Sequence, residues 1–161
     1  LRKAVRKAEK QGISVRRVND VAELEDYYSW AESVRAETDQ SLVGFRDFDT
    51  MWRHLRGQGI FETIVAEVDG RRAAGLSVWG YGDTITELGA FVSGWSKDAG
   101  LNAGDAVKWN IMQWACEAGI RTFDLAGFNP NPEDAKERLI DRFKAKWGGE
   151  RVDFSYVSRE S

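Results

Sequence analysis

The feature that most constrains the fold is a change in hydrophobic period at Phe61. Two alternating runs, "FETIVAEV" (61–68) and "RAAGLSVW" (72–79), lie on either side of Asp69-Gly70. Asp-Gly in this position predicts a β-hairpin with a type I′ turn, because both central residues of that turn need positive φ. A third run, "TITELGAFV" (84–92), follows the Tyr81-Gly82-Asp83 turn. The middle of the chain is therefore predicted to be a three-stranded antiparallel meander.

Helical periodicity surrounds this meander. Asp20 is expected to cap a helix over 20–37, and Asn131, followed by Pro132, is expected to cap a helix over 131–147. The other expected elements are an opening helix that stops at Gly12, a strand at 13–18, a short helix around 48–56, a helix at 104–119, and strands at 121–127 and 151–157. The order predicts an α/β fold, one mixed, largely antiparallel sheet flanked by helices.

The length of 161 residues fits one domain, so a single domain over 1–161 is expected. The chain opens at Leu1, inside a charged, helix-like run. We therefore expect a piece excised from a longer protein, with a neighbouring domain.

Charge is unevenly distributed along the chain. The net charge is −3, yet residues 1–17 hold seven basic side chains and one acid, Glu9. The basic residues are Arg2, Lys3, Arg6, Lys7, Lys10, Arg16 and Arg17. Such an end is typical either of a contact for phosphate, on nucleic acid, lipid or a coenzyme, or of a solvated helix face. The composition leaves both interpretations open.

Several site classes are excluded or disfavoured. No phosphate-binding glycine motif is present, and the lone Cys116 and His54 have no metal-ligand spacing, so no metal is expected. Cys116 is expected to be a small buried residue. A single cysteine excludes an internal disulfide and favours a reducing cytoplasm. No apolar run is long enough to predict a membrane span.

The loop "DLAGFNPNP" (124–132) joins a short strand to the last helix. Ligands in α/β sheets bind where strands end and helix N-termini converge. Gly127 permits close approach to the backbone, and the Asn129 side chain both donates and accepts. The alternative is that Asn129 builds a turn and Asp124 bonds only loop amides. Asp124, Gly127 and Asn129 are thus candidate substrate-binding residues.

The stretch "FKAKWGGERV" (143–152) closes the last predicted helix. Phe143 is expected to point inward, on an apolar stripe with Leu139, Ile140 and Trp147. Lys144 lies about 100° from Phe143, at the border of that stripe. It is either a terminal lysine that interacts favourably with the helix dipole, or a cation held over a cleft. In the second case it would stabilise the oxyanion of an acyl-transfer intermediate.

Three segments together resemble the FemAB-like acyltransferases, relatives of the GNAT acetyltransferases. They are "LRKAVRKAEKQGISV" at the start, "LNAGDAVKWNIMQWACEAGIRTFDLAGFNP" from Leu101, and "RFKAKWGGERV", which is similar to the family's Phe-Lys-x-x-Phe-Gly-Gly stretch. The likeness runs over most of residues 1–152 and is weakest in the first two helices and the meander.

The resemblance implies a GNAT-like fold, often present as two domains in tandem. Many members transfer an amino acid from aminoacyl-tRNA to a peptidoglycan precursor in the bacterial cytoplasm. The family's Phe-Lys pair corresponds to Phe143 and Lys144, which implies a catalytic role with Lys144 stabilising the tetrahedral intermediate. The basic opening then becomes a contact for tRNA or another phosphate-bearing substrate.

The donor loop departs from the pattern of acetyl-CoA users. Those enzymes place Arg/Gln-x-x-Gly-x-Gly/Ala before the central helix, whereas this chain has "KDAGLNAG" (97–104). Lys97 and Gly100 fit, Asn102 stands where Gly or Ala belongs, and Gly104 still offers an open amide. The expected cofactor-binding set is Lys97, Gly100, Asn102 and Gly104. No tightly bound cofactor is expected, and the donor is either aminoacyl-tRNA or acyl-CoA.

The leading hypothesis is an acyl- or aminoacyl-transferase that acts on a substrate amine, with a cell-wall precursor as a candidate acceptor. No residue identifies itself as general base: Asp124, water or the substrate could take the proton. Two alternatives stay open. In the first, the domain is a non-catalytic, substrate- or tRNA-binding half of a tandem GNAT protein. In the second, it is an acetyl-CoA-dependent small-molecule N-acetyltransferase.

Overall fold

A computed structural model describes residues 2–38, 41–127, 129 and 131–152. The contacts divide the chain into two compact units, residues 2–126 and the residues from Gly127 onward. The single domain expected over 1–161 stays a prediction.

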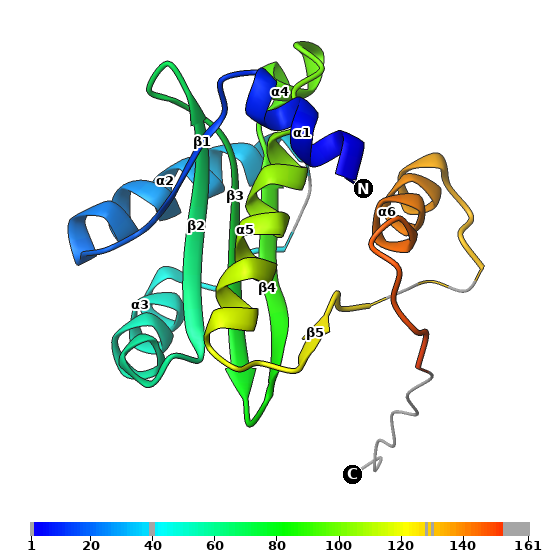
Figure 1. The fold of residues 1–161 in the computed structure, drawn as a ribbon. Coiled ribbons are helices and arrows are strands. Elements are labelled where there is room, and N and C mark those ends of the chain that lie inside the picture. The colour runs from blue at the N-terminus through cyan, green and yellow to red at the C-terminus, as the bar shows by residue number, and fades with distance from the viewer. Residues whose placement is uncertain (1, 39–40, 128, 130, 153–161) are drawn as a thin grey trace, which may run out of the picture. The chain divides into compact units, whose positions relative to one another are not determined.

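The first unit contains most of the regular structure (Figure 1). Its elements are α1 (Arg2–Lys10), β1 (Ser14–Arg17), α2 (Val21–Thr38), α3 (Phe45–Leu55), the 3₁₀ helix η1 (Arg56–Gln58), β2 (Phe61–Val68), β3 (Arg71–Tyr81), β4 (Thr84–Val92), α4 (Gly94–Asp98), α5 (Ala103–Glu117) and β5 (Thr122–Asp124). The second unit contains α6 (Ala135–Ala145).

The five strands form one sheet in the order β1-β2-β3-β4-β5. The first three pairings are antiparallel and the last, β4 with β5, is parallel. Asp69 and Gly70 have φ of 50° and 74°, as the turn between β2 and β3 requires. The predicted meander, and the mixed, largely antiparallel sheet flanked by helices, are confirmed.

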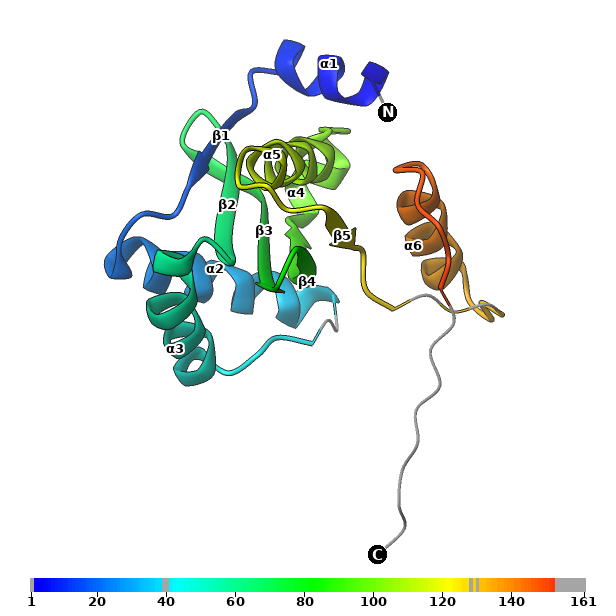
Figure 2. The ribbon, with the colours of Figure 1, turned by 60° about the horizontal axis from the view of Figure 1, so that its bottom comes forward.

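Helices cover both faces of this sheet (Figure 2). Consecutive residues of β2 show the alternation: Ile64 packs with Ile111 of α5, whereas Val65 packs with the cluster of α2 and α3 that includes Leu24 and Phe48. Both faces of β2 are therefore buried, which explains its nearly continuous apolar sequence. Each fully buried side chain of this size contributes about 1.5–3 kcal/mol to folding.

Tyr27 of α2 is a large buried residue of the cluster that α2 and α3 form against the sheet. Its hydroxyl accepts a hydrogen bond from Ser77 Oγ at 3.2 Å, and burial raises the pKa of Tyr27 to about 12. The ring fits because Gly75 of β3 has no side chain: a Cβ there would lie 2.5 Å from Tyr27 Cε2. A glycine inside this strand thus permits a close helix-to-sheet contact.

β4 contains a bulge that changes which side chains face α5. Ser77 is opposite Gly89 and Val78 is opposite Glu87, so Leu88 is the extra residue. Before the bulge Ile85 packs with the α5 cluster, and after it Ala90 and Val92 do so. One inserted residue has shifted the alternation from odd to even positions.

Several boundary predictions were wrong. β5 covers only Thr122–Asp124, because the Asp124 side chain accepts from Ala126 N at 2.8 Å and Ala126 has a φ of 59°, which ends the extended backbone. α4 was not anticipated. Cys116 is exposed because it lies next to Ala115 but on the side of α5 turned away from the sheet.

The predicted N-cap of α6 was also wrong. Asp134, not Asn131, is the N-cap, and its Oδ1 accepts from Glu137 N at 2.7 Å. Asp-x-x-Glu is a capping pattern in its own right, and it lies closer to the helix than Asn131. The strand expected at 151–157 has no regular structure at 151–152, and the rest of it lies outside the described residues.

Candidate functional site

The parallel pairing of β4 with β5 is short. It joins Thr84 to Thr122, Ile85 to Phe123 and Thr86 to Asp124. In the described part of the chain, the following residues of β4 have no strand partner on that side. An extended, amide-containing ligand can hydrogen-bond to such a free strand edge. The free edge of β4 covers residues 88–92, which lead toward the α4–α5 connection.

A buried ion pair lies at the start of this edge. Glu87, beside the bulge, forms an ion pair with Lys108 Nζ of α5. Lys108 is only 2% exposed, and its ammonium lies 6.0 Å from the centre of the Phe123 ring. Two charges removed from water are tolerated only when they compensate each other, so each holds the other in place. The pair ties α5 to β4 where β4 and β5 part.

The four residues predicted to bind a cofactor extend from α4 through the α4–α5 loop into the first turn of α5. Lys97 is exposed in α4, and Gly100 adopts a φ of 62°. Asn102 is the N-cap position of α5, and Gly104 approaches Val92 so closely that a Cβ would lie 3.2 Å from its Cγ2. The first helical hydrogen bond of α5 joins Ala106 N to Asn102 O, so the Gly104 amide precedes the helical ladder.

Two side chains already form hydrogen bonds with polar groups of this loop. Gln11, just after α1, accepts from Asn102 N at 2.9 Å and donates to Gly100 O at 3.0 Å. Asp105, which is 5% exposed, accepts from Asn102 Nδ2 at 3.2 Å and brings a carboxylate to the positive end of α5. An incoming pyrophosphate would compete with Gln11 for an amide and with Asp105 for the helix N-terminus.

The predicted substrate-binding residues make local hydrogen bonds. Asp124 accepts from Ala126 N, as the alternative interpretation proposed. In the second unit, Asn129 Oδ1 accepts from Asn131 N at 3.0 Å and Asn129 Nδ2 donates to Glu137 Oε2 at 2.9 Å. These bonds shape the backbone ahead of α6. The role of all three residues in binding stays a prediction.

Lys144 and Phe143 lie in the last turns of α6. The Lys144 ammonium donates to the carbonyl oxygen of Gly127, so two predicted site residues of this unit are in contact. Phe143 is half-buried and makes an edge contact with Trp147, their ring centres 6.3 Å apart. Leu139 and Ile140 are exposed, at 63% and 41%. The expected inward-facing stripe therefore holds only at its C-terminal end.

Glu87, Lys108 and Gln11 were not predicted from the sequence. Lys108 carried a weak signal, because it lies one turn before Ile111 on the buried side of α5. Glu87 carried a weaker one, a charge at an inward position of an alternating strand. Gln11 carried none, since its bonds connect residues 89 and 91 positions apart.

The described residues contain no group of three or more His, Cys, Asp or Glu side chains that could hold a metal ion. The same part of the chain has no helix that is both long and apolar enough to cross a membrane.

Comparison with known proteins relates this geometry to a family. The family model described as "Acetyltransferase (GNAT) domain" matches residues 1–137. The chain belongs to the GNAT acetyltransferase family. The matched range includes α1, the whole sheet and α5, and it ends before Phe143 and Lys144. The predicted class, a GNAT-type acyltransferase domain, is confirmed. A comparison with curated protein sequences finds no match.

Solved structures share this GNAT fold. A structure of FemX matches with a TM-score of 0.77 at 16% identity, over 91% of this chain and 52% of FemX. The aminoglycoside acetyltransferase AAC(6')-Iy, in complex with a bisubstrate analogue containing coenzyme A, matches with 0.65 at 13% identity, over 92% of this chain and 98% of that one. A putative acetyltransferase from Pyrococcus furiosus matches with 0.64 at 13% identity, over 92% and 99%.

This chain thus spans about half the length of FemX and nearly the whole length of the two acetyltransferases. The GNAT resemblance found in the sequence is confirmed in family, and the likeness to FemX is confirmed in fold.

Proposed function

We propose that this domain transfers an acyl or aminoacyl group from an activated ester or thioester to a substrate amine. The observation that carries the proposal is the free edge of β4 beyond Glu87 in a domain of the GNAT family. The amine nitrogen attacks the donor carbonyl, the carbon–oxygen or carbon–sulfur bond to the leaving group breaks, and the amine loses a proton. In this proposal the donor lies along β4 with its carbonyl held by backbone groups.

Lys144 would stabilise the negative charge on the carbonyl oxygen of the tetrahedral intermediate, and Phe143 would form the pocket floor. Support comes from the sequence resemblance and from the Lys144 ammonium, which already donates to a carbonyl oxygen, that of Gly127. The proton of the amine passes to Asp124, to water or to the leaving group.

For the donor, we favour an aminoacyl ester of tRNA over coenzyme A. Gln11 already accepts the hydrogen bond of Asn102 N. Asp105 places a carboxylate at the N-terminus of α5, where a pyrophosphate would bind. Both features disfavour a dianionic pyrophosphate at this loop and are neutral toward an ester bound along β4. Donor and acceptor would then place the reaction in the bacterial cytoplasm, with a cell-wall precursor as the amine.

The basic face of α1 supports a phosphate-bearing partner. Arg2, Lys3, Arg6, Lys7 and Lys10 are all exposed, whereas Arg16 and Arg17 of β1 face Glu67 and Glu62. We infer that α1 contacts tRNA or another polyanion, with an affinity that falls steeply as salt increases.

A transfer assay on the longer protein that contains this domain tests the proposal. Labelled aminoacyl-tRNA and acetyl-CoA are offered separately, each with an amine-bearing cell-wall precursor. Amide product from aminoacyl-tRNA is expected. Product from acetyl-CoA alone would instead support the small-molecule acetyltransferase. Binding of tRNA or precursor without product would contradict catalysis and support the non-catalytic half.

A further inference from the structure

Two large aromatic side chains lie exposed near the end of β3. Trp79 is 40% exposed and Tyr81 is 87% exposed, although residues 73–78 of the same strand are all buried. Alternate residues of a strand point to the same face of the sheet, so both rings are on one face. Adjacent aromatic rings left in water are typical of a surface that binds a ligand.

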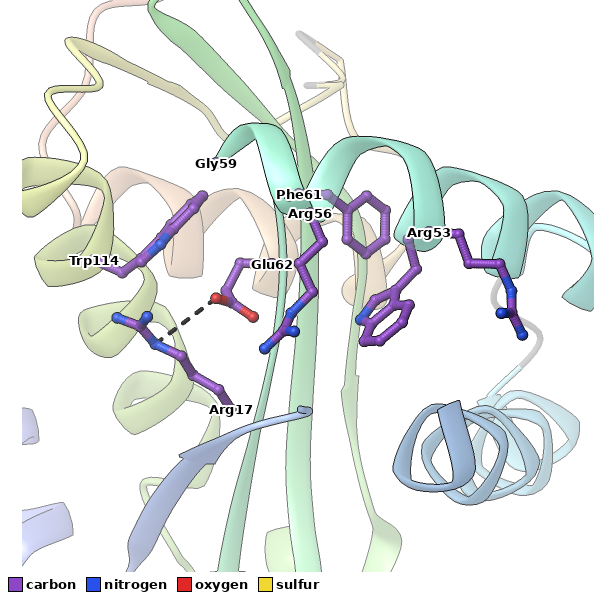
Figure 3. A pocket seen from close by; sticks show the side chains of 9 residues that line it. Arg17, Arg53, Arg56, Gly59, Phe61, Glu62 and Trp114 are labelled. Carbon is purple, nitrogen blue, oxygen red and sulfur yellow. Dashed lines mark ion pairs between the residues drawn. The ribbon is translucent and has the colours of Figure 1, made fainter. Parts of the chain in front are cut away.

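The face that carries Trp79 is the one that α2 and α3 cover farther along the sheet. Trp79 pairs with Phe61 of β2, and Phe61 packs in the cluster of α2 and α3. Phe61 and Glu62 both line a pocket of about 390 Å³. Figure 3 shows Glu62 directed toward Trp114 of α5 and Phe61 directed toward α3. Trp79 and Tyr81 are therefore on the face opposite α5.

Trp79 begins a row of three side chains across the sheet. It pairs with Thr86 of β4, and Thr86 pairs with Asp124 of β5. The preceding residue of each strand, Ile85 or Phe123, packs with the α5 cluster, so the row is on the opposite face. Neighbouring strands lie about 5 Å apart, which places the backbones of Trp79 and Asp124 about 10 Å apart. The row has an aromatic ring at one end and a carboxylate at the other.

The Asp124 carboxylate is exposed and is not neutralised by the charges near it. Its Oδ1 accepts a backbone hydrogen bond within the following loop at 2.8 Å, and no ion pair of Asp124 is recorded in the part of the chain that the structure describes. The charged residues just before β4 and β5, Asp83 and Arg121, lie 3.9 Å apart and compensate each other. Glu87 is paired with Lys108 of α5 on the other face. The row therefore carries one uncompensated negative charge.

This row lies where β4 and β5 separate. Thr86 and Asp124 are the last paired residues of the two strands, and the free edge of β4 begins two residues later, at Leu88. In the proposed transfer the donor lies along that edge, so the row adjoins the place that the substrate amine must reach. An ammonium above Thr86 has the Trp79 ring on one side, for a cation–π contact, and a carboxylate on the other, for charge-assisted hydrogen bonds.

We propose that the acceptor binds on this row through a primary ammonium group, with Asp124 and the Thr86 hydroxyl as hydrogen-bond acceptors. Trp79 is then a specificity residue that selects a cation, and Tyr81 offers aromatic surface to the neighbouring part of the acceptor. The inference rests on the proposed transfer, because it assigns a class of acceptor to that reaction. The ammonium loses one proton before its nitrogen attacks, and that proton goes to Asp124, to water or to the leaving group.

Nuclear magnetic resonance of the longer protein that contains this domain tests the site without any transfer. n-Butylammonium chloride and 1-butanol, which has no charge, are titrated separately at constant ionic strength. The Trp79 indole N–H signal is assigned from Trp79→Phe. A saturable shift of that signal is expected with n-butylammonium and not with 1-butanol. Equal shifts with both probes would overturn the proposal. So would the absence of any saturable shift, the result expected if another part of the longer protein covers this face.

Matched carboxylate variants separate the row from general attraction of cations. Asp124→Asn keeps the oxygen that accepts the backbone hydrogen bond but removes the charge, so it should weaken n-butylammonium binding about fivefold. Asp98→Asn removes an exposed carboxylate from α4 and should change binding less than about twofold. Equal weakening by both variants would overturn the proposal, because only net charge would then matter.

Matched tryptophan variants test the aromatic end of the row, with the Thr86 backbone amide signal as the reporter. Trp79→Leu should weaken n-butylammonium binding about threefold, the scale of one exposed cation–π contact. Trp109→Leu alters an exposed tryptophan of α5 and should leave binding unchanged. Equal binding by Trp79→Leu and wild type would overturn the role of Trp79.

Transfer kinetics in the longer protein distinguish failure of this inference from failure of the proposed reaction. Trp79→Leu should raise KM for the amine acceptor about threefold with kcat nearly unchanged, whereas Trp79→Phe keeps a ring and should stay within about twofold of wild type. Transfer with an unchanged KM in Trp79→Leu would overturn the inference and leave the reaction standing. Binding of n-butylammonium without any transfer would contradict the reaction, and with it the assignment of this cation site to an acceptor.

Discussion

Gln11 is bound to both sides of the α4–α5 loop: its Oε1 accepts from Asn102 N at 2.9 Å and its Nε2 donates to Gly100 O at 3.0 Å. A side chain that follows α1 thus holds the loop on which many GNAT enzymes bind coenzyme A. This contact provides a test of whether coenzyme A or an aminoacyl ester of tRNA is the donor.

Gln11→Ala should expose the Asn102 amide and strengthen coenzyme A binding several-fold, the scale of one hydrogen bond of about 0.5–1.5 kcal/mol. Isothermal titration calorimetry of wild type and variant measures it. Gln58→Ala is the control, since that side chain donates to His54 O, away from the α4–α5 loop. Weaker binding by Gln11→Ala would mean that Gln11 supports the donor rather than competing with it.

Lys144→Met should lower kcat in the longer protein at least tenfold, on the scale of losing one oxyanion-stabilising donor. Arg142→Met removes another cation from the last turn of α6 and should leave kcat nearly unchanged. Steady-state transfer kinetics, with circular dichroism to verify folding, provide the measurement. A folded Lys144→Met protein with nearly wild-type kcat would exclude the oxyanion role.

Lys108→Met should destabilise the fold by about 3–5 kcal/mol, because it leaves the Glu87 carboxylate buried without its cation. Adding Glu87→Leu should recover most of this loss, since the remaining groups are apolar. Urea unfolding of the two single variants and the double variant gives the coupling free energy. Additive losses in the double variant would show that the two side chains act independently.

Glu62→Gln should show an effect on stability that depends on pH. Burial raises the pKa of the Glu62 carboxyl, while the Thr63 N–H and the charges of Arg17 and Arg56 act in the opposite direction. The folded state therefore binds this proton more tightly than the unfolded state. Ionisation of Glu62 lowers stability as pH rises from the ordinary value of about 4.3 through the raised folded value.

The unfolding free energy of Glu62→Gln relative to wild type should accordingly increase with pH across that range, as measured by urea unfolding at several pH values. Glu117→Gln removes another carboxylate that faces Arg17, 75% exposed, and should not reproduce the trend. A difference that is constant or falls with pH would contradict the expectation.

Local sequence was sufficient for the elements whose signals are local. The Asp69-Gly70 turn, the three alternating runs and the Asp20 cap all appear as predicted, and Glu23 N donates to Asp20 Oδ1 at 2.9 Å. These features depend on positive φ, on period and on a hydrogen bond three residues away, all of which nearby residues determine. The family resemblance rested on similarly local motifs.

Only the tertiary structure decided the composition of the candidate sites. Lys108 meets Glu87 because α5 packs across the face of β4 that Ile85 and Glu87 share, and Gln11 reaches Asn102 across 91 positions. The pocket lined by Arg17, Trp52 and Glu62 likewise collects residues from β1, α3, η1, β2 and α5. Hydrogen bonds and ion pairs of this kind depend on distances in space that the folded sheet creates. Sequence spacing carries no record of them, because the same residue types on the surface would be ordinary solvated charges.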